Sequence, residues 1–125
     1  MTMKSVFAVV AVMTLGVAGA ASAAEPLEVY QARLSDQDHH NSYGERLRTV
    51  AGIIRQDRAN YHKFHVRDPE DTRDAFFAIA ENRQRLETLL LRGTVSPRAQ
   101  QMIIDGEPVV EVRVYRNHVD VDVEE

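Results

Sequence analysis

The segment RQDRANYHKFHVRD, residues 55–68, concentrates the side chains of this chain that could do chemistry. It holds three arginines, one lysine and two histidines within fourteen positions. Arginine binds carboxylates and phosphates through paired hydrogen bonds, and histidine exchanges protons near neutral pH. The segment is therefore the first candidate for an anion-binding site, and its use depends on which side chains face inward.

Helical periodicity divides this segment into two faces. Across residues 45–66, apolar side chains recur at three-, four- and seven-residue spacings, which predicts an amphipathic helix. At about 100° per residue, Arg58 and His65 fall on the edge of the apolar stripe. Arg55 and His62 lie next to them on the solvent side. These four residues form the candidate ligand-binding patch, a partly desolvated cationic group that could hold an anion.

A structural interpretation of the same residues competes with the ligand site and is favoured. Burying an unpaired charge is costly, so a buried arginine usually pairs with a carboxylate. In this interpretation the stem of Arg58 lies along the apolar stripe with its head beside an acid, and His65 bonds to backbone. Arg83 falls within the apolar stripe of the next predicted helix, which indicates an ion-pair network between the helices.

Four histidines are weak candidates for metal ligands. His62 and His65 are three residues apart on the predicted helix, and His39 and His40 follow two aspartates in a polar run. A defined site needs three or four converging ligands, and the sequence has neither an HExxH motif nor any cysteine. We therefore expect no cofactor, and a metal- or anion-binding protein is the alternative function.

Catalytic motifs are absent from the sequence. It contains no G-x-S-x-G, no P-loop and no dinucleotide fingerprint, and it has no cysteine to act as a nucleophile. Two histidines with a lysine could catalyse phosphodiester hydrolysis, but such residues occur in most chains of this size. The sequence therefore favours a non-enzymatic binding or interaction module over an enzyme, and a small hydrolase ranks third.

Residues 1–23 have the layout of a cleavable secretory signal peptide. Lys4 precedes an apolar run from Val6 to about Ala18, and small residues follow up to Ala23. The run is shorter than the roughly 20 residues of a spanning helix, so we expect a periplasmic or secreted protein without a membrane anchor after cleavage. Cleavage removes Lys4 and none of the 19 acidic residues, so the formal charge changes from −4 to −5. This charge gives no long-range attraction to nucleic acid or anionic lipid.

The rest of the chain predicts a small α+β domain over residues 45–125, preceded by an extended segment and polar loop over residues 24–44. Asp68 followed by Pro69 is a helix start signal, which predicts a second main helix ending at Gly93. A break at Asn82 into two shorter helices is the alternative. Ser96-Pro97 repeats the start signal for a short third helix through about Ile104.

The C-terminal stretch PVVEVRVYRNHVDVDV alternates valines with polar residues and changes parity in its middle. This pattern predicts an antiparallel hairpin that turns around Arg116-Asn117, with one bulged strand as the alternative. Two strands alone are marginal, and the stretch LEVYQARL near the N-terminus is the candidate third strand. If the hairpin lies at a sheet edge, VVEVRVY could accept a strand from a protein partner or from a second copy.

Overall fold

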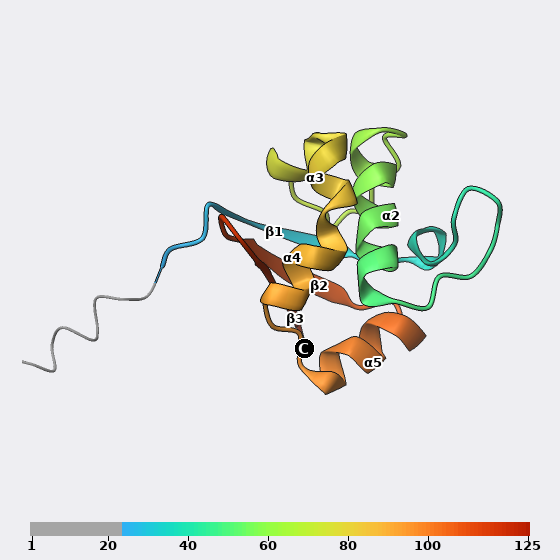
Figure 1. Ribbon diagram of the computed structural model, residues 1–125. Helices are drawn as coiled ribbons and strands as arrows, with labels where there is room; N and C mark the ends of the chain where they lie inside the picture. Colours follow the sequence, from blue (N-terminus) through green and yellow to red (C-terminus); the bar gives the residue numbers. More distant parts are fainter. Residues whose placement is uncertain (1–23) are drawn as a thin grey trace, which may run out of the picture.

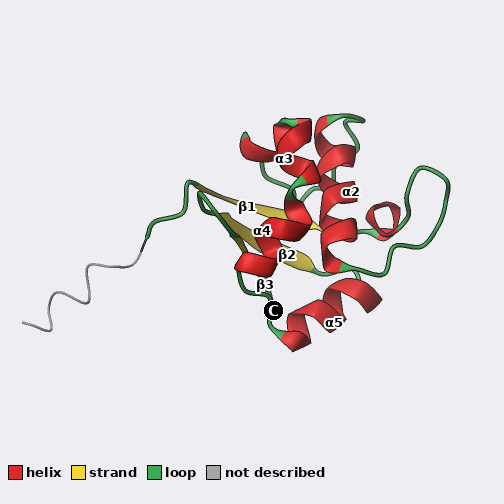
Figure 2. Ribbon diagram, viewed as in Figure 1, coloured by secondary structure: helices red, strands yellow, loops and turns green. Residues whose placement is uncertain are grey.

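The computed structural model describes residues 24–125 and has an α+β fold (Figures 1 and 2). The segment predicted to be a signal peptide lies outside the described residues. In chain order the elements are β1 (Glu28–Arg33), the 3-10 helix η2 (Asp36–His39), α2 (Val50–His62), the 3-10 helix η3 (Phe76–Ala78), α3 (Ala80–Gln84), α4 (Leu86–Arg92), α5 (Pro97–Asp105), β2 (Val109–Val114) and β3 (Val119–Val123).

The three strands form one antiparallel sheet in the order β1-β2-β3, which confirms LEVYQARL as the third strand. Alternate residues of each strand are buried, because successive side chains of a strand point to opposite faces. Figure 2 shows α2 and α4 crossing one face of this sheet. The buried strand side chains join helix residues in a single apolar core: Tyr30, Ala32, Leu34, Ile53, Ile54, Phe77, Leu86, Leu89, Ile103, Val110, Val112, Val114, Val119 and Val121.

Strand β2 lies in the centre of the sheet, so the segment VVEVRVY is not the free edge that strand addition requires. The two edge strands are partly covered by loops. On β1, the Thr72 N–H donates to the Gln31 carbonyl at 2.9 Å. On β3, the Val121 N–H donates to the Thr94 carbonyl at 3.0 Å. A partner at the hairpin would therefore have to approach β3 past Thr94.

Helix α2 is shorter than the helix predicted over residues 45–66. It begins after Thr49, whose extended backbone and side-chain oxygen, accepting from the Gly52 N–H at 3.0 Å, form an N-cap. It ends at His62, and the chain then turns through His65, which has a positive φ of 60°. Arg55, Arg58 and His62 are therefore helical, whereas His65 lies beyond the helix, which removes it from the predicted stripe.

The predicted helix start at Asp68 is wrong, because these residues form a turn. The Asp71 N–H donates to the Asp68 carbonyl at 3.0 Å, and the Asp68 N–H donates to Asp71 Oδ2 at 2.8 Å. Asp71 Oδ1 also accepts from the backbone of Arg33 at 2.9 Å, which ties the turn to β1. Aspartate side chains that bond to nearby backbone stabilise such loops in competition with a helix.

Helical structure resumes only with η3, and the segment predicted as one second helix consists of η3, α3 and α4. The break between α3 and α4 falls at Arg85, where ψ is 0°, and not at Asn82. Gly93 ends α4 as predicted. The alternative of two shorter helices is thus confirmed, with its boundary displaced along the chain.

Two predictions near the C-terminus are confirmed. The Ser96 side chain accepts from the Ala99 N–H at 3.1 Å, and α5 starts with Pro97. The Tyr115 N–H donates to the His118 carbonyl at 2.9 Å and closes the turn of the hairpin, so the chain does not continue as one bulged strand. Among residues 24–125, none of the helices combines the length and the apolar content needed to cross a membrane.

Candidate functional site

Arg58, on α2, is fully buried at 0% exposure and lies between two carboxylates. Its Nε donates to Asp57 Oδ2 at 2.9 Å and its Nη1 donates to Asp74 Oδ1 at 2.6 Å. Asp74 Oδ1 also lies 2.8 Å from His62 Nε2. We call Asp57, Arg58, His62 and Asp74 the Arg58 cluster. Because Asp74 precedes η3, the cluster ties the loop before η3 to the middle of α2.

Two aromatic rings lie against the Arg58 guanidinium. Its Cζ lies 4.1 Å from the centroid of the Tyr30 ring and 4.4 Å from that of Tyr61. A cation over an aromatic face is attracted by the ring, and the attraction is strongest where water is excluded. Burial raises the pKa of the Tyr30 hydroxyl well above its ordinary value of 10.0, so this ring stays neutral beside the guanidinium.

A third carboxyl group, that of Asp38 on η2, lies beside the Arg58 cluster. Asn60 Nδ2 donates to Asp38 Oδ1 at 2.8 Å, and the side chains of Asp38 and Asp57 are within hydrogen-bonding reach. Burial raises the pKa of Asp57 well above its ordinary value of 3.8, against the attraction of Arg58, and Asp38 raises it further. Burial also raises the pKa of Asp38. Two buried carboxyl groups, Asp57 and Asp74, thus share one guanidinium with a third, Asp38, beside them, and burial favours the protonated form of Asp57.

We expect Asp57→Asn to change the free energy of unfolding at mildly acidic pH by less than about 1 kcal/mol, because burial favours the protonated carboxyl and an amide reproduces it. Its oxygen can accept from Arg58 and its NH₂ can donate to Asp38. Because the pKa of Asp57 is higher in the folded than in the unfolded protein, its protonation stabilises the fold. This contribution is complete below pH 3.8 and is lost as pH rises through the folded pKa. Urea unfolding from mildly acidic to neutral pH should therefore show a smaller loss of stability in the variant.

The control for this prediction is the difference between the two proteins at each pH. That difference cancels the contribution of Glu70, whose pKa is lowered by its hydrogen bond from Arg33. The stability that Glu70 contributes increases as pH rises, whereas the contribution of Asp57 decreases. A variant with the same pH dependence as the original chain would show that Asp57 does not carry the proton. A variant strongly destabilised at neutral pH would show that Asp57 is needed as a carboxylate.

The structure does not bring the four predicted ligand-binding residues together. Arg58 and His62 meet through Asp74, whereas the side chains of Arg55 and His65 are exposed. Within residues 24–125, no hydrogen bond or ion pair links Arg55 or His65 to the Arg58 cluster. Arg58 Nη2 has no hydrogen-bond partner among the described residues, but the guanidinium is fully buried, so an anion from solvent could reach it only if the fold around it opened. The pairing of Arg58 with two carboxyl groups is what the structural interpretation of this residue predicts. Anion binding at the patch stays a prediction.

Arg83 differs from the predicted ion-pair network. Its Nη1 donates to the backbone carbonyls of Phe77 at 2.8 Å and of Ala78 at 3.3 Å. The guanidinium therefore binds the open carbonyl end of η3, where cations are favourable, and makes no ion pair with a described residue.

The two adjacent histidines of the polar run face different surroundings. His39 is buried, with Nδ1 2.8 Å from the Ser35 carbonyl and Nε2 2.8 Å from the Ile103 carbonyl, so both ring nitrogens are occupied. His40 Nδ1 lies 3.1 Å from the Asp36 carbonyl. In the part of the chain that the structure describes, no three histidine or carboxylate side chains gather closely enough to hold a metal ion.

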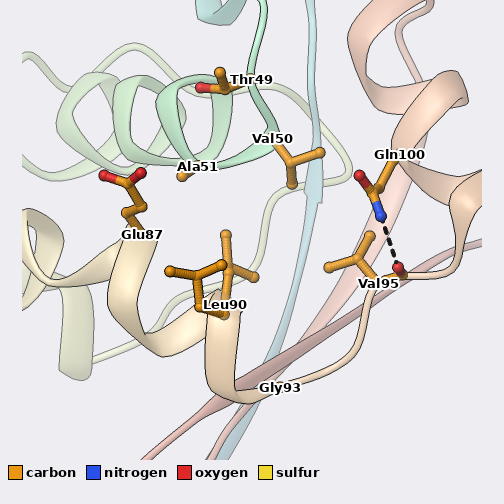
Figure 3. A pocket seen from close by; sticks show the side chains of 9 residues that line it. Thr49, Val50, Ala51, Glu87, Leu90, Gly93, Val95 and Gln100 are labelled. Carbon is orange, nitrogen blue, oxygen red and sulfur yellow. Dashed lines mark hydrogen bonds between the residues drawn. The ribbon is translucent and has the colours of Figure 1, made fainter.

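The apolar cavity of greatest interest lies where the start of α2 meets α4 and α5 (Figure 3). Its volume is about 330 Å³, and it is open to solvent. Figure 3 shows Val50, Leu90 and Val95 around the space, with Glu87 and Gln100 on opposite sides. We call it the α2–α4–α5 cavity, and its lining residues are Thr49, Val50, Ala51, Glu87, Leu90, Leu91, Gly93, Val95 and Gln100.

Hydrogen-bond acceptors dominate the polar part of this cavity. Glu87 makes no hydrogen bond or ion pair with any residue from 24 to 125, so its carboxylate is available. Gln100 Nε2 donates to the Val95 carbonyl at 3.0 Å, which leaves the amide oxygen as the free group. The Thr49 oxygen accepts from the Gly52 N–H, and its hydroxyl hydrogen remains a donor. The cavity therefore presents two acceptors, the Glu87 carboxylate and the Gln100 amide oxygen, beside one hydroxyl group.

Sequence reasoning missed the α2–α4–α5 cavity, although one signal for it exists. Leu89, Leu90 and Leu91 are consecutive on α4, and a helix covered on one side cannot bury three successive side chains. Leu89 is in the core, whereas Leu91 is 80% exposed. The exposed leucine lies at the cavity, which increases the apolar surface offered to a ligand.

Comparisons of the chain with models of protein families, with curated proteins and with solved structures find no match.

Proposed function

We propose that this protein is an exported, non-enzymatic binding module, and that the α2–α4–α5 cavity takes a small ligand with an apolar body and a cationic or donor-bearing head. The observation that carries the proposal is the open, mostly apolar cavity of about 330 Å³ with an unpaired carboxylate at its side. Small-molecule sites in proteins are commonly apolar concavities of about this size with a few polar groups that orient the ligand. The export part of the proposal rests on the signal-peptide pattern of residues 1–23.

The two parts of the ligand follow from the two kinds of lining. Val50, Leu90 and Val95 offer apolar contact to a hydrocarbon body. Glu87 offers a charge-assisted hydrogen bond to an ammonium group. A non-catalytic role agrees with the Arg58 cluster, whose acids and guanidinium are buried and bound to one another.

The test uses octylammonium as the probe, with octanol and octanoate as matched ligands that change only the head group. We expect octylammonium to bind most tightly in calorimetry and to shift the amide resonances of Val50, Ala51 and Leu90. Glu87→Gln should weaken octylammonium by about tenfold, because it removes the charge-assisted bond, and should leave octanol unchanged.

Ala51→Phe tests the position of the site, because a larger side chain on the cavity wall fills the space while the charge of Glu87 is kept. Binding of both octylammonium and octanol should be lost. Ala80→Phe, at an exposed position of α3, adds the same volume elsewhere and should bind as the original chain does. Failure of octylammonium to bind, or unchanged binding by Ala51→Phe, would overturn the proposed site.

A further inference from the structure

The residues that follow α2 form a surface loop in which basic and apolar side chains alternate. Lys63, His65 and Arg67 alternate with Phe64 and Val66, and all five are exposed. Phe64 is 52% exposed and Val66 is 42% exposed. We call these five residues the 63–67 loop. Exposing the apolar side chains of Phe64 and Val66 to water is unfavourable, and neither residue belongs to the core cluster.

This loop is held in a defined shape. The Val66 N–H donates to the Asn60 carbonyl at 2.8 Å, and Arg67 Nε donates to the Tyr61 carbonyl at 3.3 Å. His65 between them has a φ of 60°, a conformation that residues other than glycine rarely adopt. A strained residue kept in place by its surroundings is a feature that often accompanies binding loops. The exposure of Phe64 and Val66 is thus built into the end of α2.

Charge is distributed unevenly between this loop and the rest of the molecule. The chain has a formal charge of −4, whereas the 63–67 loop carries Lys63 and Arg67 and no acid. Four of the acidic residues lie on β3 and the C-terminal tail: Asp120, Asp122, Glu124 and Glu125. In Figure 1 the end of α2 lies beside α3, at the opposite end of the molecule from the C-terminus. At physiological ionic strength, charges farther apart than about 8 Å are largely screened, so a surface that touches the loop experiences its cations.

We propose that the 63–67 loop docks this protein on an anionic lipid surface, with Phe64 and Val66 entering the interface and Lys63 and Arg67 beside the headgroups. Aromatic and apolar side chains flanked by lysine and arginine are the pattern of interfacial segments. An acidic protein segment is a less suitable partner, because a peptide needs a groove for its side chains. The cavities that the fold offers near α4, α5 and β1 are lined by other residues. This docking is independent of the ligand proposed for the α2–α4–α5 cavity.

The test uses residues 24–125, which hold all the described elements, and vesicles sedimented from solution. Vesicles of phosphatidylcholine alone are compared with an equal mixture of phosphatidylcholine and phosphatidylglycerol. We expect binding to the mixed vesicles only, with a loss as salt is added. Lys63→Gln should weaken this binding about fivefold, and Phe64→Ser should weaken it about tenfold.

Two controls separate the loop from the protein's general surface. Arg55→Gln removes an exposed cation of α2 outside the loop, and Tyr43→Ser removes an aromatic ring that is 87% exposed elsewhere. Both should bind like the original chain, and circular dichroism checks that every variant is folded. The proposal is overturned by absence of binding to the mixed vesicles, by equal binding to both vesicle types, or by a Lys63→Gln effect no larger than that of Arg55→Gln. Capture by soluble poly-glutamate that is as strong as capture by the mixed vesicles also overturns it, in favour of an acidic protein partner.

Discussion

Replacing Arg58 by methionine is expected to lower the free energy of unfolding by about 3–5 kcal/mol. Methionine keeps much of the side-chain volume but removes the cation that Asp57 and Asp74 share in the interior. Removing one partner of a buried ion pair leaves the other charge uncompensated, and here Asp74 loses its charged partner while Asp57 loses its hydrogen-bond donor. The rings of Tyr30 and Tyr61 also lose the guanidinium that both of them contact.

Urea unfolding followed by circular dichroism measures this loss. Arg55→Met is the matched control, since Arg55 is an exposed arginine on the same helix, and its effect should stay within about 0.5 kcal/mol. Adding Asp74→Asn to Arg58→Met should recover part of the loss, because a buried amide without a partner costs less than a carboxylate. Equal stability of Arg58→Met and the original chain would mean that the Arg58 cluster contributes nothing to the fold.

Replacing Gly93 by alanine is expected to destabilise the protein by about 3 kcal/mol. A Cβ at this position would lie 2.7 Å from the carbonyl carbon of Val119 and closer still to its oxygen. These are backbone atoms of β3, which is paired with β2, so they cannot move away without breaking the sheet. The same close approach lets Thr94 bond to Val121 and to Asp120, which would be disturbed as well.

Thermal and urea unfolding of Gly93→Ala, compared with Gly106→Ala, test this steric explanation. A Cβ at Gly106 would lie 3.1 Å from the Met102 carbonyl oxygen and would meet no other heavy atom within 4 Å. The effect of Gly106→Ala should therefore remain within about 1 kcal/mol. Similar losses for the two variants would show that glycine is needed at helix ends in general, and that contact with β3 is not the cause.

Local signals were sufficient for the elements whose stabilising contacts lie close together along the chain. The parity change between the two sets of valines predicted the hairpin, because each strand buries alternate side chains against the same core. Ser96 and Pro97 predicted the start of α5, because a cap bonds to a residue only three positions away. The lack of cysteine and the α+β class likewise depend on composition and pattern.

Identical local signals failed where a tertiary contact competed with them. Asp68 and Pro69 carry the same start signal as Ser96 and Pro97, yet they form a turn because Asp71 bonds to the backbone of β1. The local pattern of VVEVRVY could not tell whether this strand lies at the edge or in the centre of the sheet. It is central because β1, from the other end of the chain, pairs with it.

The candidate sites divide in the same way. Spacing alone placed Arg58 at the border of the apolar stripe of α2, since helical geometry depends only on neighbours along the chain. Its partner Asp74, 16 residues away, and the covering ring of Tyr30 on β1 come into contact only when the chain folds. The α2–α4–α5 cavity is likewise formed by side chains from three helices, and no one-dimensional pattern encodes the space between elements. Periodicity in this sequence thus determined which side chains turn inward, and long-range packing decided what each of them meets there.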